Sequence, residues 1–371
     1  MTTTARPRAR DVGLRLGTLS PGPNNAIIDV AGVAVGHVTV VSGEGELRRG
    51  SGPFRTGVTV ILPHDGNLFR EKVPAATFVM NGYGKSVGLA QIDELGVIES
   101  PIALTGTLNV GIVADGLVEH AVRENPDIGV TTSSFNPVVG ECNDGTLSDL
   151  QGRPVRQEHV LAAIETAVDG SVAEGAVGAG AGMVLYGFKG GVGTASRVLP
   201  ESAGGYTVGV LVLGNFGRRD QLHIAGVPVG YRLRDWKPVP DVVESGSIMV
   251  IIATDAPVLD RALRRMARRA PLGLARTGSI AGHGSGDFMI AFSTAQRIPH
   301  EPEENVLTLR HIVEDGQVID GLFQAVVEAS EEAVVNALFA ATTVEGRDGN
   351  VRHALPLDET LAMLREAGAL S

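Results

Sequence analysis

Short runs of apolar residues, bounded by glycine, proline or polar turn residues, recur along the chain. The runs are rich in valine, isoleucine, leucine and phenylalanine, and most are too short for a helix of ordinary length. Runs of this kind are typical of buried β-strands. The pattern therefore predicts strands at Ala26–Val30, Gly57–Leu62, Ala75–Met80, Val208–Leu213, Ile248–Ala253 and Phe288–Ser293.

Other segments repeat their apolar residues every three or four positions, which indicates amphipathic helices. These segments are Ser86–Leu95, Gly111–Glu124, Glu158–Asp169, Val258–Arg269, Gly321–Leu338 and Leu357–Ala367. Helices and strands interleave without strict alternation, because several strand-like runs follow one another within residues 172–213. The order favours an α/β protein in which mixed or antiparallel sheets form a sandwich with helices outside, rather than a doubly wound parallel sheet.

The strand predicted at Ile248–Ala253 follows directly on a polar, turn-prone stretch, and Ser247 lies at the junction. If the Gly246–Ser247 bond were cut, Ser247 would carry a hydroxyl and a free α-amine. Such an amine has an ordinary pKa of about 7.7–8.0, near the pH at which a general base works best. A hydroxyl activated in this way is a recognised hydrolase nucleophile. The residues alone leave a second interpretation open, in which Gly246-Ser247 is only a turn before a core strand.

The segment Arg218–Gly246, which leads to Ser247, is the clearest linker in the sequence. It contains the single tryptophan, Trp236, several prolines including Pro240, and acidic residues near its end. A long irregular segment inside a compact domain is often functional or flexible. A cleavage site at its end is therefore reasonable, because the two parts of the chain must be able to separate there.

Composition and charge exclude several classes of protein. Of the 371 residues, 43% are hydrophobic and 20% are charged, which is typical of a globular protein with a sizeable core. The net charge of −11 argues against nucleic-acid binding, which needs a basic surface. The only cysteine, Cys142, rules out an internal disulfide framework. No apolar signal region follows the basic N-terminus, and no stretch approaches the roughly 20 apolar residues of a membrane span. We therefore expect a cytoplasmic protein without membrane partners.

The sequence predicts no metal and no organic cofactor. The nine histidines are scattered and form no cluster with cysteine. The glycines of Gly178–Gly182 have the wrong spacing for a dinucleotide loop, and residues 189–194, Lys-Gly-Gly-Val-Gly-Thr, lack the order of a phosphate loop. The latter segment is better interpreted as a hairpin turn. Cys142 has no histidine following nearby, which favours inert packing over a thiol nucleophile.

Four further stretches of the sequence affect the interpretation of Ser247, because their order matches a known family. They are Asn25-Ala-Ile-Ile-Asp-Val-Ala-Gly-Val-Ala-Val-Gly-His37, Val79-Met-Asn-Gly-Tyr-Gly-Lys-Ser86 with Thr105-Gly-Thr-Leu-Asn-Val-Gly111, Val139-Gly-Glu-Cys-Asn-Asp-Gly145, and Gly282-His-Gly-Ser-Gly-Asp287. Together with Gly-Ser-Ile-Met-Val and Ala-Thr-Asp-Ala-Pro at residues 246–257, their order strongly resembles the DmpA/BapA-type aminopeptidases. That family comprises L-aminopeptidase/D-amidase-esterases and β-peptidyl aminopeptidases. The resemblance covers roughly residues 15–365, and it is the ordered set, rather than any one motif, that is specific.

The resemblance implies a fold and a maturation step. The fold is a four-layer α/β/β/α sandwich, similar in layering to N-terminal-nucleophile hydrolases but differently connected. The chain, a single domain over residues 1–371, would cut itself before the nucleophile into an α fragment, residues 1–246, and a β fragment, residues 247–371. Family members commonly assemble as tetramers of αβ units, so a homo-oligomer is expected. Substrates would be small peptides, amides or esters with a free amino terminus, and no cofactor is required.

The resemblance also implies roles for individual residues. Ser247 matches the nucleophile, and Asn215 matches an asparagine that resembles an oxyanion-hole donor. Ser285 and Asp287 match a serine–acid pair that assists proton handling. Glu141 matches a glutamate suited to holding the substrate's ammonium group, which a charge-assisted contact would favour.

The sequence departs from the family pattern at two of these positions. Asp287 stands where some members have glutamate, so the carboxylate is one methylene shorter. Asn143 stands where at least some members have a catalytic tyrosine, which puts the role of that phenol in question. Two alternatives to a serine aminopeptidase therefore stay open. One is acetyl transfer or ω-amino amide hydrolysis on the same scaffold, and the other is an unprocessed, non-catalytic oligomeric protein.

Overall fold

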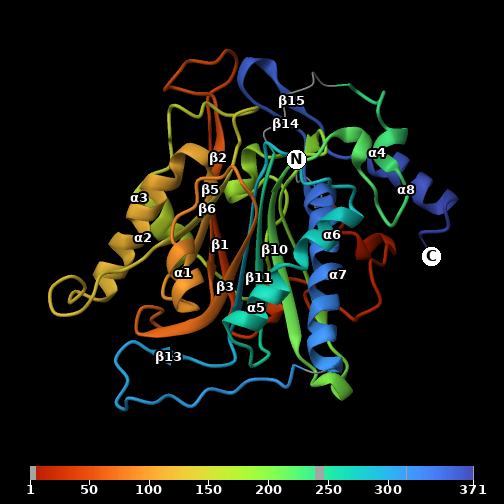
Figure 1. Cartoon of the computed structure of the whole chain (residues 1–371). Coiled ribbons are helices and arrows are strands. Elements are labelled where there is room, and N and C mark those ends of the chain that lie inside the picture. Colours follow the sequence, from red (N-terminus) through yellow and green to blue (C-terminus); the bar gives the residue numbers. More distant parts are fainter. Residues whose placement is uncertain (1–5, 239–245, 315, 371) are drawn as a thin grey trace.

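The computed structural model describes residues 6–238, 246–314 and 316–370. Two β-sheets pack against each other at its centre (Figure 1). The smaller sheet has the strand order β1-β2-β5-β6, in which only β5 and β6 run parallel. Its strands are β1 (Ala34–Ser42), β2 (Phe54–Leu62), β5 (Ile102–Gly106) and β6 (Val138–Cys142).

The larger sheet has the order β13-β3-β12-β11-β10-β9, with β4 paired to β3 at one side. Only β11 and β12 are parallel neighbours. This mixed sheet agrees with the expectation of a sandwich rather than a doubly wound sheet. Its strands are β3 (Glu71–Gly82), β4 (Val97–Ile98), β9 (Gly191–Val198), β10 (Thr207–Asn215), β11 (Ser247–Thr254), β12 (Gly286–Ser293) and β13 (Ile298–Pro299).

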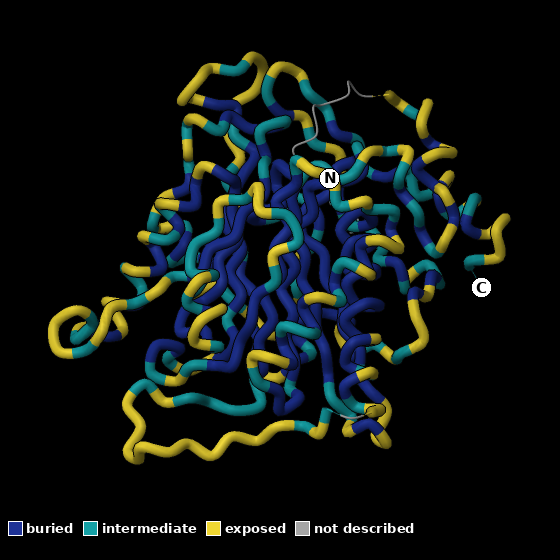
Figure 2. The backbone as a smooth tube through the Cα atoms, viewed as in Figure 1, coloured by how far each residue is buried: buried dark blue, intermediate teal, exposed yellow. Residues whose placement is uncertain are grey.

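Helices cover the outer faces of both sheets, so the buried residues concentrate in the strands and in the helix faces against them (Figure 2). Helices α2 and α3 pack on the smaller sheet, and α5, α6 and α7 lie on the side of the larger sheet. The helices are α1 (Leu89–Leu95), α2 (Val110–Glu124), α3 (Gln157–Glu165), α4 (Val229–Arg232), α5 (Asp260–Ala267), α6 (Ala270–Arg276), α7 (Gln317–Ala340) and α8 (Leu357–Glu366). No helix of the described residues has the length and apolarity needed to cross a membrane.

The strand β11 is apolar from Ile248 to Ala253, and it is buried on both faces. Met249 and Ile251 belong to the core between the two sheets, whereas Ile248 and Val250 belong to the core beneath the helices. Successive strand residues point to opposite faces. A strand covered on both faces therefore has a continuous apolar run rather than an alternating one. By the same alternation, Ser247 lies on the side of Met249, toward the space between the sheets.

Most elements predicted from the apolar pattern are confirmed, and the strand at Ala26–Val30 is wrong. That segment contains a 3₁₀ turn at Ile27–Asp29 instead. The carboxylate of Asp29 accepts hydrogen bonds from the backbone N–H groups of Asn24, at 2.9 Å, and Ala26, at 3.1 Å. Local bonds of this kind compete with a strand ladder. A short apolar run cannot reveal that competition.

The hairpin turn predicted at residues 189–194 is also wrong, because the turn lies a few residues earlier. Strand β7 (Val184–Leu185) pairs with β8 (Phe188–Lys189), and Tyr186 and Gly187 form the turn between them, with φ of 50° and 69°. Two consecutive positive φ values are typical of a type I′ turn. A second small hairpin joins β14 (Val344–Glu345) to β15 (Val351–Arg352).

The segment before Ser247 is also less irregular than expected. Its described part, residues 218–238, contains α4 and buries Leu222, Ile224 and Leu233 in the core beneath the helices. This part is therefore anchored to the domain rather than a free linker. Pro240, Asp241 and Glu244 lie outside the described residues.

Candidate active site

Ser247 is buried at the first position of β11, with 4% of its surface exposed. The antiparallel register of β10 and β11 places it directly opposite Asn215, the last residue of β10. Two N–H groups approach its hydroxyl oxygen: Asn143 N at 3.2 Å and Asn215 Nδ2 at 3.4 Å. The structure thus brings together three residues that are far apart in the sequence. In an acyl-transfer site, N–H donors beside the attacking hydroxyl can stabilise the oxyanion that forms on the attacked carbonyl.

The side-chain amide of Asn215 is held at both ends. Its Oδ1 accepts a hydrogen bond of 2.8 Å from the backbone N–H of Val184, at the start of the β7–β8 hairpin. This bond leaves Nδ2 directed at Ser247. Nothing in the sequence pattern singled out Val184, because its contribution comes from the backbone.

Asn143 reaches Ser247 through its backbone rather than its side chain. The backbone N–H makes the contact, and the side-chain oxygen accepts a hydrogen bond of 2.9 Å from the N–H of Gly145. The position that carries tyrosine in some family members therefore supplies a main-chain donor in this chain. Such a donor does not depend on the identity of the side chain.

The carbonyl of the bond predicted to be cut also has a donor. The backbone N–H of Gly286 lies 3.0 Å from the carbonyl oxygen of Gly246, because β11 and β12 are paired in parallel with Ser247 beside Gly286. A hydrogen bond to a carbonyl oxygen stabilises the negative charge that develops there during nucleophilic attack. Gly286 lies within the segment Gly282–Asp287, but nothing in the sequence pattern indicates this role, because it depends on the backbone N–H.

Ser285 and Asp287 form a hydrogen-bonded pair beside Gly246. The Ser285 hydroxyl donates to Asp287 Oδ1 at 2.5 Å, and Asn81 Nδ2 donates to Asp287 Oδ2 at 2.8 Å. A Cβ atom placed on Gly246 would lie 3.1 Å from Ser285 Oγ, so this hydroxyl adjoins the predicted cleavage site. Burial raises the pKa of Asp287, and the hydrogen bonds from Ser285 and Asn81 oppose that rise. The shorter aspartate thus reaches its serine, and Asn81 is a partner that the sequence did not assign.

Glu141 is buried in β6 with one carboxylate oxygen unused. Its Oε1 accepts the backbone N–H of Lys85 at 3.0 Å, and the Lys85 ammonium lies 3.7 Å from the same oxygen. The other oxygen, Oε2, is buried without a hydrogen-bond partner. An unpaired buried carboxylate oxygen is costly. The Oε2 atom of Glu141 can accept a hydrogen bond from a cationic group.

Cys142, the last residue of β6, lies between Glu141 and Asn143 in the chain and is fully buried. Its Sγ lies 3.2 Å from the carbonyl oxygen of Leu213, and burial raises the pKa of its thiol well above the usual range. A thiol with a raised pKa is a poor nucleophile. The geometry supports the interpretation of Cys142 as an inert residue packed in the core.

Asp144 is a buried acid next to this cluster, and burial raises its pKa from 3.8 to about 7. A carboxyl group with a raised pKa in the folded state lowers the free energy of unfolding, by an amount that is absent below pH 4 and fully present above pH 7.

We expect Asp144→Asn to match the wild type in unfolding free energy near pH 4. Because each pKa unit corresponds to about 1.4 kcal/mol, the variant should become a few kcal/mol more stable by pH 8. Urea denaturation at both pH values measures this, and an equal difference at both would contradict the prediction.

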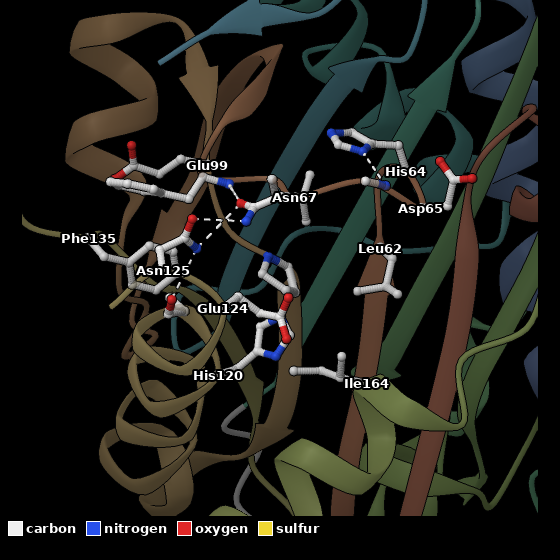
Figure 3. A pocket seen from close by; sticks show the side chains of 15 residues that line it. Leu62, His64, Asp65, Asn67, Glu99, His120, Glu124, Asn125, Phe135 and Ile164 are labelled. Atoms are coloured by element: carbon white, nitrogen blue, oxygen red, sulfur yellow. Dashed lines mark hydrogen bonds between the residues drawn. The ribbon is translucent and has the colours of Figure 1, made fainter. Parts of the chain in front are cut away.

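A cavity of about 290 Å³ borders the site on the side of Gly246, Ser285 and Asp287, and Arg218 also lines it. A second cavity, of about 280 Å³, lies away from the site, between the C-terminal end of α2 and the segment after β2, where Asn67 and Asn125 hydrogen-bond to each other (Figure 3). None of the predicted site residues lines this second cavity. Within the described ranges, no group of three or more His, Cys, Asp or Glu side chains is placed to hold a metal.

Comparisons with known proteins cover almost the whole chain. Residues 25–352 match the family model described as peptidase family S58. The beta-peptidyl aminopeptidase BapA of Sphingosinicella xenopeptidilytica is 43% identical over 97% of this chain and 92% of its own length. A solved protein of Pyrococcus horikoshii OT3 is 52% identical, with a TM-score of 0.93 over 98% of this chain and 99% of its own.

A further solved structure has a described activity and fold. It is the L-aminopeptidase D-Ala-esterase/amidase of Ochrobactrum anthropi, a prototype for the serine aminopeptidases that reveals a new variant of the Ntn hydrolase fold. It is 39% identical to this chain, with a TM-score of 0.91 over 99% of this chain and all of its own. The likeness in sequence and fold, over nearly the full length, identifies the chain as a peptidase with an Ntn-like α/β architecture. The chain belongs to peptidase family S58.

Proposed function

We propose that this chain is a self-processing serine aminopeptidase with Ser247 as its nucleophile. The observation that carries the proposal is the convergence of the Asn143 and Asn215 N–H donors on the Ser247 hydroxyl oxygen. In the first step, Ser247 Oγ attacks the Gly246 carbonyl carbon and the C–N bond breaks, which leaves an ester and a free α-amine on Ser247. Water then cleaves the ester, giving fragments 1–246 and 247–371. The Gly286 N–H, on the carbonyl oxygen, supports charge development in this step.

In the mature site, Ser247 attacks the first carbonyl of a substrate and forms an acyl-enzyme. The Ser247 α-amine, or the Ser285–Asp287 pair beside it, takes the hydroxyl proton and the proton passes to the leaving amine. The N–H donors of Asn215 and Asn143 stabilise the oxyanion. Water attacks the ester, releases the amino acid and restores the hydroxyl. No step requires a metal or organic cofactor.

The unpartnered Oε2 of Glu141 favours a substrate with a free amino group. An ammonium placed there would gain a charge-assisted hydrogen bond and satisfy a buried acceptor. The BapA relatives act, by their name, as beta-peptidyl aminopeptidases, so we include β-amino acyl substrates with α-amino acyl ones. A panel of β-alanyl, L-alanyl and D-alanyl p-nitroanilides, each with and without N-acetylation, tests this. We expect hydrolysis of free-amine substrates only, and equal rates on acetylated ones would contradict the proposal.

We also propose that the fold is the four-layer α/β/β/α sandwich expected from the resemblance. The placement of α2 and α3 outside one sheet and of α5, α6 and α7 outside the other supports this layering. The division into two fragments, the tetramer of αβ units and the cytoplasmic location stay predictions.

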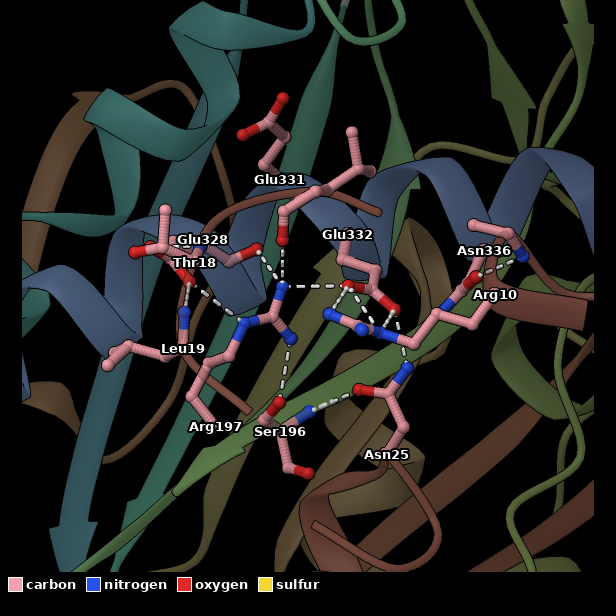
Figure 4. Close-up of polar contacts among 12 residues, drawn as sticks. Arg10, Thr18, Leu19, Asn25, Ser196, Arg197, Glu328, Glu331, Glu332 and Asn336 are labelled. Carbon is pink, nitrogen blue, oxygen red and sulfur yellow. Dashed lines mark hydrogen bonds and ion pairs between the residues drawn. The ribbon is translucent and has the colours of Figure 1, made fainter. Parts of the chain in front are cut away.

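A buried ion-pair network joins the two proposed fragments (Figure 4). Arg197 of β9 has no exposed side-chain surface and contacts Glu328 at 3.1 Å and Glu332 at 2.7 Å, both on α7. Arg10 also pairs with Glu332, at 2.8 Å. The two glutamates lie four residues apart and therefore share one face of the helix. This network would keep residues on both sides of the cleavage site associated after the bond is cut.

Removing the arginine at the centre of this network should be strongly destabilising. We expect Arg197→Met to lower the free energy of unfolding by about 3–5 kcal/mol, because it leaves the buried Glu328 without its cation and Glu332 with Arg10 alone. Arg276→Met is the matched control, since Arg276 pairs with Glu331 on the same helix but its side chain is 50% exposed. Its loss should cost about 1 kcal/mol or less. Chemical denaturation compares the two, and equal losses would contradict the assigned role of Arg197.

A further inference from the structure

Lys189 is a buried lysine whose hydrogen-bond partners are backbone carbonyls. It lies at the end of β8 with no exposed surface, and its Nζ donates to the carbonyl oxygens of Gly190 at 2.7 Å, Gly180 at 2.8 Å and Met183 at 2.9 Å. Burial disfavours the charged amine and lowers its pKa to about 7. The three acceptors nevertheless match the three protons of the ammonium form. The nearby buried acid Asp144 attracts the ammonium and opposes the fall in its pKa. A buried cation whose direct hydrogen bonds all go to neutral carbonyls is still costly, which raises the question of what it does.

One of the three carbonyls belongs to the peptide that orients Asn215. The Met183 oxygen and the Val184 N–H are the two ends of a single peptide unit. Lys189 Nζ, at 2.9 Å, and the Gly190 N–H, at 3.2 Å, hold the oxygen end, and the N–H end donates to Asn215 Oδ1. Because a peptide unit is planar and rigid, fixing its carbonyl also fixes the direction of its N–H. The lysine is therefore one of two donors, and the only charged one, that fix the direction in which this peptide presents its N–H to Asn215.

The contacts form a continuous chain of donors from the ammonium to the nucleophile. Lys189 Nζ donates to Met183 O at 2.9 Å, Val184 N to Asn215 Oδ1 at 2.8 Å, and Asn215 Nδ2 to Ser247 Oγ at 3.4 Å. Hydrogen bonds linked through amide groups polarise one another, and a cation at the start of such a chain strengthens each later donor. The positive charge of a residue that does not touch substrate thus acts at the oxyanion hole.

We propose that Lys189 is a positioning residue that aligns and polarises the Asn215 amide through the Met183–Val184 peptide. The inference rests on the proposed function, in which Asn215 stabilises the oxyanion. Its effect should appear in the chemical step, since Asn215 is assigned no contact with the ground-state amine of the substrate. Removal of one oxyanion-hole donor typically costs about 10²–10³ in rate. The loss of its alignment should cost less, on the order of tenfold to a hundredfold.

The test is a double-mutant cycle on Lys189 and Asn215, measured as kcat and KM on an accepted anilide. We expect Lys189→Met to lower kcat about 10–100-fold with KM changed less than threefold. In the Asn215→Ala background, the same change should lower kcat less than threefold, because the group through which Lys189 acts is gone. An unchanged kcat in the single variant, or an equal loss in both backgrounds, would overturn the proposal.

Two further variants separate positioning from stability. Val184→Pro removes the N–H in the middle of the chain and keeps Lys189, and the extended conformation of Met183 (ψ 144°) accommodates a following proline. It should reproduce the kcat loss even if Lys189→Met does not fold. Lys72→Met is the matched control, because Lys72 is a mostly buried lysine that pairs with Glu99 outside the site. It should lower the melting temperature without changing kcat, and a kcat loss equal to that of Lys189→Met would overturn the proposal.

Failure of this inference is distinguishable from failure of the proposed function. Wild type and Ser247→Ala are measured in parallel. If the wild type neither cuts itself nor hydrolyses any anilide, the proposed function fails, and the inference about Lys189 fails with it. If the wild type is active and Lys189→Met and Val184→Pro are equally active, only the inference fails.

Discussion

Ser247→Ala is expected to leave the chain in one piece and to lower amidase activity by at least roughly 10⁴-fold. The same hydroxyl is proposed to perform both the self-cleavage and the attack on substrate, so its loss removes both. The substitution deletes one oxygen at a buried position and leaves the Asn143 and Asn215 donors without their acceptor. That change is too small to prevent folding. A gel of the purified protein and an anilide assay measure the two effects.

The control for this variant is Ser247→Thr, which keeps a hydroxyl at the same atom. We expect it to cut itself, more slowly than the wild type, because the added methyl group must fit at a buried position. A cooperative melting transition in Ser247→Ala shows that the uncut chain is folded. If Ser247→Ala were cut at the normal rate, or retained activity, the nucleophile would be another group.

Glu141→Gln is expected to lower kcat/KM for free-amine substrates on the order of 10²-fold while leaving self-cleavage intact. Glutamine has the shape of glutamate and can still accept the Lys85 N–H bond, but it lacks the charge that would pair with an ammonium. Breaking a hydrogen-bonded, buried charge pair costs about 2–5 kcal/mol. Self-cleavage involves no ammonium, so the fragments should form normally. Steady-state kinetics and a gel of the same preparation measure both effects.

The matched control is Glu99→Gln, which neutralises another buried glutamate that pairs with Lys72. It should destabilise the protein without changing kcat/KM. If Glu141→Gln blocked self-cleavage as well, Glu141 would act on the nucleophile rather than on the substrate. A kcat/KM unchanged by the substitution would exclude Glu141 as the amine site.

Local patterns in the sequence predicted the strands that carry the site. The run after Ser247 is apolar at every position because β11 is buried on both faces, and that property is visible without any knowledge of its neighbours. The segment Ala26–Val30 has a similar composition but forms a 3₁₀ turn, since Asp29 captures backbone N–H groups. Composition cannot separate these two outcomes.

The roles of site residues came from the resemblance, whereas their partners came from the fold. Asn81 donates to Asp287 across more than 200 residues, and the Gly286 N–H reaches Gly246 only because β11 and β12 pair in parallel. Contacts of this kind depend on register, which a single sequence does not display. The sequence does carry one signal for Lys189, which is the only charged residue between Glu174 and Arg197, in a stretch rich in glycine and apolar residues. A solitary charge in such a stretch indicates a buried cation.

The central claim is that the chain cuts itself between Gly246 and Ser247, and the intact mass of the purified wild-type protein under denaturing conditions tests it most directly. Our account predicts two species, whose masses match residues 1–246 and residues 247–371, with serine at the N-terminus of the second. A single species of full length that persists through prolonged incubation, in a preparation that hydrolyses free-amine anilides, would contradict it. Activity would then come from an uncut chain, and a terminal Ser247 amine would have no part in the mechanism.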